Sequence, residues 1–371
     1  MTVRVMFAGG GTGGHLYPGL AIARALVRQA PEVRPFFVGA LRGIERDVLP
    51  KTEFEHLLLD LHPLYRQQPW KSWRTVRGLG SAWKALTREH RANPAATVIG
   101  TGGYASGAAL AFALAHGIPL QLQEQNSIPG ITTRFFARHA RAVYLGYPEA
   151  RARLHPGAHT ELVDSGNPIE PPPSPRPSRA DACAAWGFPA SGERVVLAFG
   201  GSQGARPLND AIAALLDAGL PAGVLLIWGT GQGSYERYAR YESERVRVRP
   251  YLAPIQGAYA AADLALTRAG ALTVAELCAW GIPSLLVPLP TAAADHQRAN
   301  ARALEGAGAA LVLEQSELSA TRLGSALADL LRDSTRLGRM AESATSRGRP
   351  DAAERIATRI LRLAQLKSVG A

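Results

Sequence analysis

The sequence predicts an α/β protein of two domains, each built on a parallel sheet with helices on both faces. Short apolar segments that run into glycine-rich loops recur along the chain, and segments with helical apolar spacing follow them. The pattern of strand, glycine loop and helix that begins at residue 3 begins again at residue 195. This alternation is typical of doubly wound, Rossmann-like domains, and 371 residues are enough for two of them.

The individual elements follow from the same patterns. The first strand is expected at residues 3–8, and its apolar run ends in glycines. Residues 16–27 have the apolar spacing of the helix that follows, and residues 352–366 form an amphipathic helix near the end of the chain. Further strands that enter glycine-containing loops are expected at residues 96–99, 195–199, 224–228 and 264–267.

A proline-rich segment separates the two domains. Residues 166–178 contain six prolines in thirteen positions, which rules out a helix or a central strand and favours an extended connector. The C-terminal helix can pack on either domain by its composition. The predicted order is an N-terminal domain at 1–165, a linker at 166–180, a C-terminal domain at 181–350 and a final helical segment at 351–371 that can return to the N-terminal domain.

Composition limits the class of protein. Apolar residues make up 47% and charged residues 19% of the chain, which is enough to fill cores and excludes a disordered protein. The longest run of small apolar residues, 105–115, is shorter than the roughly 20 residues that cross a bilayer. Cys183 and Cys278 have no ligand spacing and no D-x-D triplet occurs, so we expect no disulfide, no metal site and a cytoplasmic chain.

The net charge of +11 lies mostly in the N-terminal half. Residues 1–165 have 19 Lys+Arg against 11 Asp+Glu, and residues 62–91 within them have 7 against 1. Trp70, Trp73 and Trp83 are interleaved with these bases, a composition that suits an anionic membrane surface. A nucleic acid would use the same charge. An ordinary solvated helix whose tryptophans pack inward is a further alternative.

The first glycine loop, residues 9–14, matches G-x-G-x-x-G between a strand and a helix, which is typical of dinucleotide binding. NAD binding also requires an acid at the end of the second strand, and residues 36–42 contain none. The P-loop motif is absent from the sequence as well. Because glycine loops let backbone N–H groups approach phosphates, several such loops in two domains indicate ligands with diphosphates.

Two residues beside the glycine loops are candidates for chemistry. His15 begins the helix after the first loop, where an imidazole can act as a general base at neutral pH. Glu276 follows residues 270–273 near a second helix start, where a carboxylate can accept both ribose hydroxyls. The alternatives are a polar residue that only begins a helix and a glutamate that only faces solvent.

A series of short motifs runs in order over nearly the whole chain. The motifs are residues 10–15 (GGTGGH) with 18–21 (PGLA), 102–107 (GGYASG), 124–126 (EQN), 166–168 (GNP), 200–205 (GGSQGA), 270–276 (GALTVAE) and 295–297 (DHQ). This series resembles that of the MurG family of bacterial GlcNAc transferases. The resemblance implies the GT-B fold and inverting, metal-independent transfer of GlcNAc from UDP-GlcNAc to the muramyl 4-hydroxyl of lipid I, which forms lipid II.

The resemblance also implies roles for the residues at matching positions. His15 would be catalytic, residues 271–273 would face the diphosphate, and Glu276 the ribose. The donor-binding residues would be Thr12, Gly13, Gly14, Asn126, Ser202, Gln203, Leu252, Ala271, Leu272, Thr273, Glu276 and Gln297. The acceptor-binding residues would be Gly13, Gly14, Gly103, Tyr104 and Glu124.

One position departs from the family pattern. The family usually has an arginine shortly after Gly-Asn-Pro, and Glu170 stands there in this chain. The nucleotide contact that this arginine provides is therefore in doubt. Arg176 or Arg179 could supply it instead.

The implied acceptor decides between the alternatives for the basic segment. Lipid I is an undecaprenyl-diphosphate-linked muramyl peptide and lies in the membrane, so membrane docking is favoured over nucleic acid. The implied partners are UDP-GlcNAc, lipid I and the anionic inner leaflet of the cytoplasmic membrane, and other cell-wall proteins are possible partners. The protein would be peripheral on the cytoplasmic face of this membrane. No cofactor is implied. The docking residues would be Trp70, Lys71, Trp73, Arg74, Arg77, Trp83 and Lys84.

Two other functions use the same glycine loops. Another GT-B enzyme on UDP-sugars, such as a UDP-GlcNAc 2-epimerase or a transferase for soluble acceptors, has no use for the basic, tryptophan-containing segment. A non-catalytic scaffold that binds membrane and cell-wall partners does not require His15 and Glu276 beside intact glycine loops, so these residues argue against it.

Overall fold

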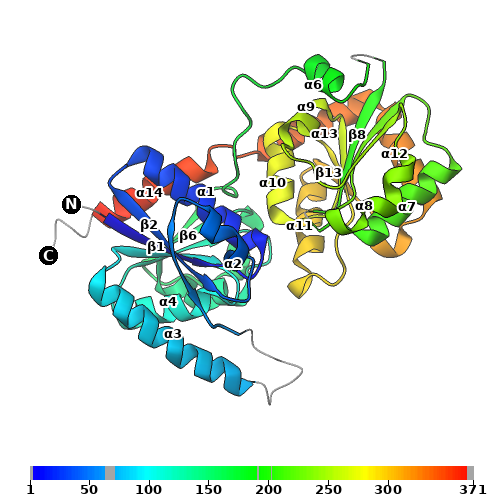
Figure 1. Ribbon diagram of the computed structural model, residues 1–371. Helices are drawn as coiled ribbons and strands as arrows, with labels where there is room; N and C mark the ends of the chain where they lie inside the picture. The colour runs from blue at the N-terminus through cyan, green and yellow to red at the C-terminus, as the bar shows by residue number, and fades with distance from the viewer. Residues whose placement is uncertain (1–2, 63–71, 190–191, 202, 366–371) are drawn as a thin grey trace. The chain divides into compact units, whose positions relative to one another are not determined.

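The computed structural model describes residues 3–62, 72–189, 192–201 and 203–365, which form two compact units (Figure 1). Unit 1 contains Met1–Glu170 together with Asp351–Ala371, and unit 2 contains Pro171–Pro350. The chain therefore passes between the units within the proline-rich segment and again just before its last helix.

Unit 1 is built on a sheet whose described strands all pair in parallel, in the order β3-β2-β1-β4-β5-β6-β7. Its five inner strands are buried along most of their length, as expected for a sheet covered on both faces, whereas the two edge strands are mostly exposed or half-buried. The strands are β1 Val3–Gly9, β2 Val33–Ala40, β3 Glu55–Leu59, β4 Thr97–Gly102, β5 Leu120–Glu124, β6 Ala140–Leu145 and β7 Glu161–Asp164.

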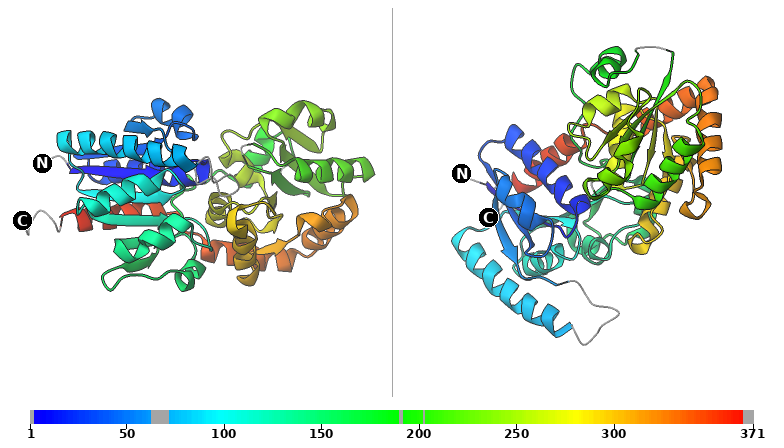
Figure 2. Two further views of the ribbon diagram at one scale, coloured as in Figure 1. Left: turned by 90° about the horizontal axis from the view of Figure 1, so that it is seen from below. Right: turned by 45° about the vertical axis from the view of Figure 1, so that its right-hand side comes forward.

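Helices cover both faces of this sheet (Figure 2) because successive residues of each strand point to opposite sides. Met6 packs among residues of α3 and α4 on one face, whereas Phe7 packs among residues of α1 and α14 on the other. The helices are α1 Gly13–Gln29, α2 Glu45–Val48, α3 Ser72–Ala92, α4 Ser106–Ala115, α5 Ile131–Phe136 and α14 Ala352–Gln365, with 3-10 turns at Leu49–Lys51, Ala137–His139 and Pro148–Arg153.

The last helix, α14, packs on unit 1 although it follows unit 2 in the sequence. Its apolar stripe buries Ile356 and Ile360 against the residues of α1. The Arg28 guanidinium of α1 donates to Glu354 of α14 at 2.5 Å, and Gln29 donates to the Glu354 carbonyl at 3.0 Å. Composition alone left the partner of this helix open, and these contacts identify it.

Unit 2 repeats the architecture. Its described strands also pair in parallel, in the order β10-β9-β8-β11-β12-β13. Val196 packs among residues of α7 and α12, whereas Val195 packs among residues of α6, α9 and α10 on the opposite face. The strands are β8 Arg194–Phe199, β9 Val224–Gly229, β10 Val246–Arg249, β11 Leu264–Thr267, β12 Ser284–Leu286 and β13 Ala310–Val312.

The helices of unit 2 follow its strands along the chain. They are α6 Arg179–Ala185, α7 Arg206–Ala218, α8 Tyr235–Tyr238, α9 Gln256–Ala261, α10 Ala271–Trp280, α11 His296–Gly306, α12 Ala320–Arg332 and α13 Ser334–Arg347. Single 3-10 turns lie at Gln232–Ser234, Ala239–Tyr241, Ala293–Asp295 and Gln315–Glu317.

In each sheet the strand order reverses beside the first strand, between β1 and β4 in unit 1 and between β8 and β11 in unit 2. Doubly wound sheets bind ligands at the carboxyl ends of the strands at such a switch point. The glycine loops that the sequence singled out leave the carboxyl ends of these four strands. The predicted fold class is therefore confirmed, and the fold places the loops where ligands are expected.

Candidate active site

The two glycine loops of unit 1 lie against each other at the switch point. The Gly10 N–H donates to the Gly102 carbonyl at 3.4 Å. A Cβ atom at Gly103 would lie 2.1 Å from the Gly10 carbonyl oxygen, and Gly103 has a φ of +76°. Only glycine allows this approach, so the glycines bring the loop after β1 into contact with the loop after β4.

His15 lies in the first turn of α1 and faces the second loop. Its Nδ1 is 2.9 Å from the Thr12 hydroxyl oxygen. A Cβ atom at Gly102 would lie 2.7 Å from His15 Cδ2, so the imidazole packs on the backbone of the loop after β4. In the tautomer whose Nδ1–H donates to Thr12, Nε2 carries the lone pair that a general base needs.

Tyr104 and Gly13 complete the surroundings of this loop pair. A Cβ atom at Gly11 would lie 2.8 Å from Tyr104 Cε1, which places the tyrosine ring on the first glycine loop. A Cβ atom at Gly13 would lie 3.0 Å from Tyr17 Cε2. The structure therefore brings His15 and Tyr104 to the contact between the two loops, while Thr12 and Gly14 are exposed on the first loop.

Glu45, which the sequence analysis did not single out, is buried beside the first glycine loop. Its carboxylate accepts the Gly11 N–H at 2.9 Å and the Ala40 N–H at 3.0 Å. Residues 36–42 contain no acid, as the sequence analysis noted, and Glu45 reaches back from the short helix α2 to bind backbone N–H groups at the end of the second strand. Glu45 fixes the conformation of the first loop through its bond to the Gly11 N–H. Because this N–H is already bonded, it is not available to a phosphate.

We expect Glu45→Gln to lower the free energy of unfolding by about 1–3 kcal/mol, because the amide NH₂ would face a buried backbone N–H in place of a carboxylate oxygen. Asp47→Asn is the matched control, because Asp47 lies on the same short helix, is exposed and pairs with Arg46. Urea unfolding of both variants measures the difference. Equal stability of the Gln variant and the wild type would contradict the role assigned to Glu45.

The loop after β5 is held by the carboxylate of Glu124. This carboxylate accepts the Asn126 N–H at 3.0 Å and the Gly130 N–H at 3.0 Å. Burial raises the pKa of Glu124, while the hydroxyl of Thr133 and the two N–H groups act in the opposite direction. These bonds give Glu124 a positioning role for the loop that carries Asn126, and its contact with an acceptor stays a prediction.

The asparagine of the Gly-Asn-Pro motif belongs to a buried hydrogen-bond network in unit 1. The buried Asn167 accepts from Gln123 Nε2 at 3.1 Å and donates to the Gln125 carbonyl at 2.9 Å. Gln125 in turn donates to the Thr101 carbonyl at 2.8 Å. This buried chain of amides ties the segment after β7 to the loops after β4 and β5.

In unit 2 the loops after β8 and β9 are in backbone contact. A Cβ atom at Gly204 would lie 2.2 Å from the Thr230 carbonyl oxygen, and one at Gly231 would lie 2.6 Å from the Gln203 carbonyl oxygen. Both glycines have positive φ angles. The side chain of Gln203 is exposed on this loop, whereas Ser202 lies outside the described residues.

The loop after β11 leads directly into α10. Gly270 precedes Ala271 as its N-cap and supplies no side-chain acceptor, so the N–H groups of the first turn point out of the helix end. The buried Asn300 donates to the Ala269 carbonyl at 3.3 Å and holds the loop. This helix N-terminus, with Leu272 and Thr273 in its first turn, has the polarity that a diphosphate requires.

Glu276 lies one turn further along α10 and is half-buried. The hydroxyl of Tyr259, from α9, donates to Glu276 Oε2 at 2.7 Å. Burial and the neighbouring Glu276 carboxylate hold the pKa of Tyr259 well above its usual value, so the tyrosine stays a donor. Sequence patterns gave no signal for Tyr259, which fixes the orientation of the Glu276 carboxylate.

The segment before α11 combines backbone strain with a fixed glutamine. Ala294 and Asp295 have φ angles of 52° and 56°, a conformation that costs energy in residues other than glycine and is common at functional sites. Gln297 Oε1 accepts the Leu289 N–H at 3.0 Å, so its amide nitrogen is the end of the side chain that can contact a sugar hydroxyl.

Leu252, a further predicted donor-binding residue, packs on Gly229, where an added Cβ would lie 3.0 Å from Leu252 Cδ1.

Neither arginine considered as a substitute at Glu170 points to the α10 N-terminus. Arg176 donates to the carbonyls of Ala279 and Trp280 at 2.8 Å and 3.3 Å, at the opposite end of α10. Arg179 forms an ion pair with Asp263 at 2.8 Å. The suggestion that one of them replaces the family arginine at the nucleotide is therefore not supported.

Of the predicted docking residues, Trp83 and Lys84 have described side chains. Trp83 is 40% exposed, and its ring contacts Phe112 edge-on with 5.2 Å between centroids, so it packs partly inward. Lys84 is exposed. Trp73, Arg74 and Arg77 lie in α3 but their side chains are outside the described part, as are Trp70 and Lys71 altogether.

Two features are absent from the part of the chain that the structure describes. None of the helices there is both long enough and apolar enough to cross a membrane. Among the same residues, no group of three or more His, Cys, Asp or Glu side chains is placed to hold a metal ion.

Two doubly wound units with glycine loops at both switch points have the architecture of the GT-B class. Residues 5–145 match the glycosyltransferase family 28 N-terminal domain, and residues 195–356 match the C-terminal domain of the same family. The chain belongs to glycosyltransferase family 28.

Relatives with long matches carry one activity in their names. Proteins of Moorella thermoacetica and Salinibacter ruber, each named UDP-N-acetylglucosamine--N-acetylmuramyl-(pentapeptide) pyrophosphoryl-undecaprenol N-acetylglucosamine transferase, are 40% and 41% identical to this chain. The matches cover 97% of this chain in both cases, and 99% and 96% of the two relatives.

Solved structures agree on the fold. The crystal structure of Acinetobacter baumannii MurG superimposes with a TM-score of 0.76 at 28% identity, over 97% of this chain and 99% of that one. A UDP-N-acetylglucosamine 2-epimerase reaches a TM-score of 0.62 at 13% identity, over 96% and 95%. The fold alone therefore does not separate transferase from epimerase, whereas sequence identity favours the transferase.

Proposed function

We propose that this chain transfers GlcNAc from UDP-GlcNAc to the 4-hydroxyl of the muramyl sugar in undecaprenyl-diphospho-muramyl pentapeptide. The observation that carries the proposal is the identity of about 40% over 97% of the chain to transferases named for this reaction. The glycine loops, the fixed Glu276 and His15 beside the second loop of unit 1 supply groups that such a reaction uses.

The donor half of the reaction belongs to unit 2. The first turn of α10 would stabilise the diphosphate, because its N–H groups and the helix dipole favour negative charge. Glu276, oriented by Tyr259, would accept the ribose hydroxyls, and Gln297 would contact the sugar. The predicted donor residues Thr12, Gly13, Gly14 and Asn126 lie in unit 1, so their contact with the donor remains a prediction.

The acceptor half belongs to unit 1. His15 Nε2 would take the proton of the 4-hydroxyl while Thr12 accepts the Nδ1–H bond and fixes the tautomer. The hydroxyl oxygen then attacks C1 of GlcNAc from the side opposite UDP, which leaves as a diphosphate. One such displacement inverts the configuration at C1 without a covalent sugar intermediate.

Transfer should not require a divalent metal ion. The sequence lacks the D-x-D triplet, and the α10 N-terminus would offset the charge on the leaving UDP. We expect EDTA to leave the initial rate unchanged in an assay with UDP-GlcNAc and a lipid I analogue. Loss of activity with EDTA and recovery with Mg²⁺ would refute this part of the proposal.

A UDP-GlcNAc 2-epimerase is the second candidate, since one shares this fold. The two functions differ in what they need. A transferase releases UDP in proportion to the acceptor added, whereas an epimerase interconverts the sugar without an acceptor. Acceptor-dependent UDP release supports the proposal, and epimerisation of UDP-GlcNAc in the absence of acceptor would overturn it.

Membrane docking through α3 is also part of the proposal, since the acceptor carries an undecaprenyl chain. Each basic residue near an anionic surface contributes about 1 kcal/mol, so Lys84→Gln should lower partitioning to phosphatidylglycerol vesicles about fivefold. Lys51→Gln is the control, because Lys51 is exposed on another part of unit 1. Equal losses in the two variants in vesicle sedimentation would count against α3 as the docking element.

A further inference from the structure

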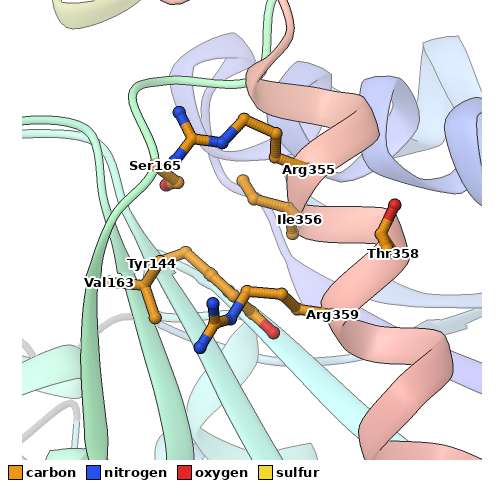
Figure 3. A pocket seen from close by; sticks show the side chains of 7 residues that line it. All are labelled: Tyr144, Val163, Ser165, Arg355, Ile356, Thr358 and Arg359. Atoms are coloured by element: carbon orange, nitrogen blue, oxygen red, sulfur yellow. The ribbon is translucent and has the colours of Figure 1, made fainter.

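A cavity of about 220 Å³ lies within unit 1, between α14 and the carboxyl ends of β6 and β7. It is lined by both polar and apolar groups. Figure 3 shows Arg355 and Arg359 extending from α14 toward the strands, Arg355 toward Ser165 and Arg359 toward Tyr144. None of these residues has a part in the transfer reaction described above.

The charges around the cavity do not cancel. Arg359 forms an ion pair with Glu161. Arg355, one turn earlier on α14, has no carboxylate partner within ion-pair distance among the described residues. Two guanidinium groups at this spacing repel each other, and Arg355 lies in the first turn of the helix, where the dipole is already positive. Arg355 is exposed to solvent, and the cavity therefore carries a net positive charge on its solvent-facing side.

The remaining polar groups add no negative charge. Burial raises the pKa of Tyr144, whose neutral hydroxyl donates to Gln121 Oε1 at 2.6 Å. The buried Ser165 hydroxyl donates to the Gly166 carbonyl at 2.9 Å. Because both hydroxyl groups already donate their protons within the protein, the two arginines are the groups that can donate to a ligand.

The volume limits the ligand to a small one. A volume of 220 Å³ corresponds to about seven water molecules at about 30 Å³ each and is below the roughly 300–1,000 Å³ of drug-sized ligand sites. Guanidinium groups bind phosphate oxygens through two parallel N–H bonds. From the cavity, its two arginines and the single compensating carboxylate we infer that this pocket binds a phosphate-type oxyanion.

A ligand here would join parts of the chain next to both crossings between the units. Ser165 precedes the crossing at Glu170 to Pro171 by five residues, and Arg355 follows the crossing at Pro350 to Asp351. An oxyanion held by Arg355 and Arg359 would link the start of α14 to the end of β7. It would thereby stabilise unit 1 at the points where the chain leaves and re-enters it.

The ligand could be free phosphate or the phosphate of a lipid headgroup, and two arms of one experiment separate these sources. The full-length protein is titrated with sodium phosphate by calorimetry at constant ionic strength, with sodium chloride as reference. In the second arm it is sedimented with phosphatidylglycerol or phosphatidylcholine vesicles. Wild type, Arg355→Gln and the control Arg362→Gln, an exposed arginine of α14 outside the cavity, are compared.

Saturable binding of phosphate that weakens about tenfold or more in Arg355→Gln, but not in Arg362→Gln, supports the site with a soluble ligand. Loss of phosphatidylglycerol binding confined to Arg355→Gln, without binding of free phosphate, supports the site with a headgroup. The inference is overturned if neither probe binds, or if Arg355→Gln behaves as wild type or as Arg362→Gln with both.

Discussion

His15→Ala is expected to lower turnover by about 10²–10⁴-fold while UDP-GlcNAc binding stays nearly unchanged. The imidazole packs on Gly102 in unit 1, whereas Glu276 and the α10 N-terminus lie in unit 2. An interaction that strengthens toward the transition state affects kcat more than ground-state binding. Steady-state kinetics with a lipid I analogue, together with calorimetric titration of UDP-GlcNAc, measures both quantities.

The matched control for this variant is His159→Ala, because His159 is exposed in unit 1 away from the glycine loops. A general base must be neutral, so the wild-type rate should fall as the pH is lowered and His15 becomes protonated. A charged donor would give the opposite trend. Turnover of His15→Ala within a few-fold of wild type would show that His15 only begins α1.

Glu276→Ala is expected to weaken UDP-GlcNAc binding about ten- to a hundredfold. The substitution removes charge-assisted bonds to the ribose worth roughly 1.5–3 kcal/mol in total. Tyr259→Phe should give a smaller loss, because it keeps the carboxylate but removes the 2.7 Å bond that orients it. Calorimetric titration of UDP-GlcNAc against each variant measures the dissociation constants.

Glu317→Ala serves as the control for the donor site, since Glu317 is exposed in unit 2. Thermal unfolding of each variant separates a lost contact from a lost fold. Unchanged donor affinity in a folded Glu276→Ala protein would return Glu276 to the role of a surface residue. A loss in Tyr259→Phe as large as in Glu276→Ala would mean that the tyrosine itself contacts the ligand.

Patterns that depend on local sequence were the ones that predicted structure well. Strand periodicity and glycine spacing gave β1, β8 and β11 with the loops after them, because a parallel strand is apolar throughout and glycine permits the positive φ that these loops use. The whole-chain order of the motifs then led to the family. These features need no knowledge of distant contacts.

Features that depend on distant contacts were missed or left open. Glu45 was overlooked because its role arises only when α2 folds back on the first loop, 34 residues away from Gly11. Tyr259 orients Glu276 from another helix, and nothing in the spacing of α9 indicates this. The partner of the last helix, left open by its composition, was settled by burial of Ile356 and Ile360 against α1.

Some residues of the predicted motifs make hydrogen bonds within the protein itself. Asn167 of the Gly-Asn-Pro motif bonds to Gln123 and Gln125, and Glu124 binds backbone N–H groups of its own loop. A motif marks both the groups that touch a ligand and the groups that hold them, and spacing does not tell the two apart. Side-chain hydrogen bonds do.

The structure of the product is the most direct test of the proposed inverting transfer of GlcNAc. The purified protein is incubated with UDP-GlcNAc and a lipid I analogue, and the product is examined by NMR. We expect a β-configured GlcNAc joined to the 4-oxygen of the muramyl sugar, with one UDP released per sugar transferred. An α-linked product, a link at another oxygen, or GlcNAc released to water without transfer would contradict it.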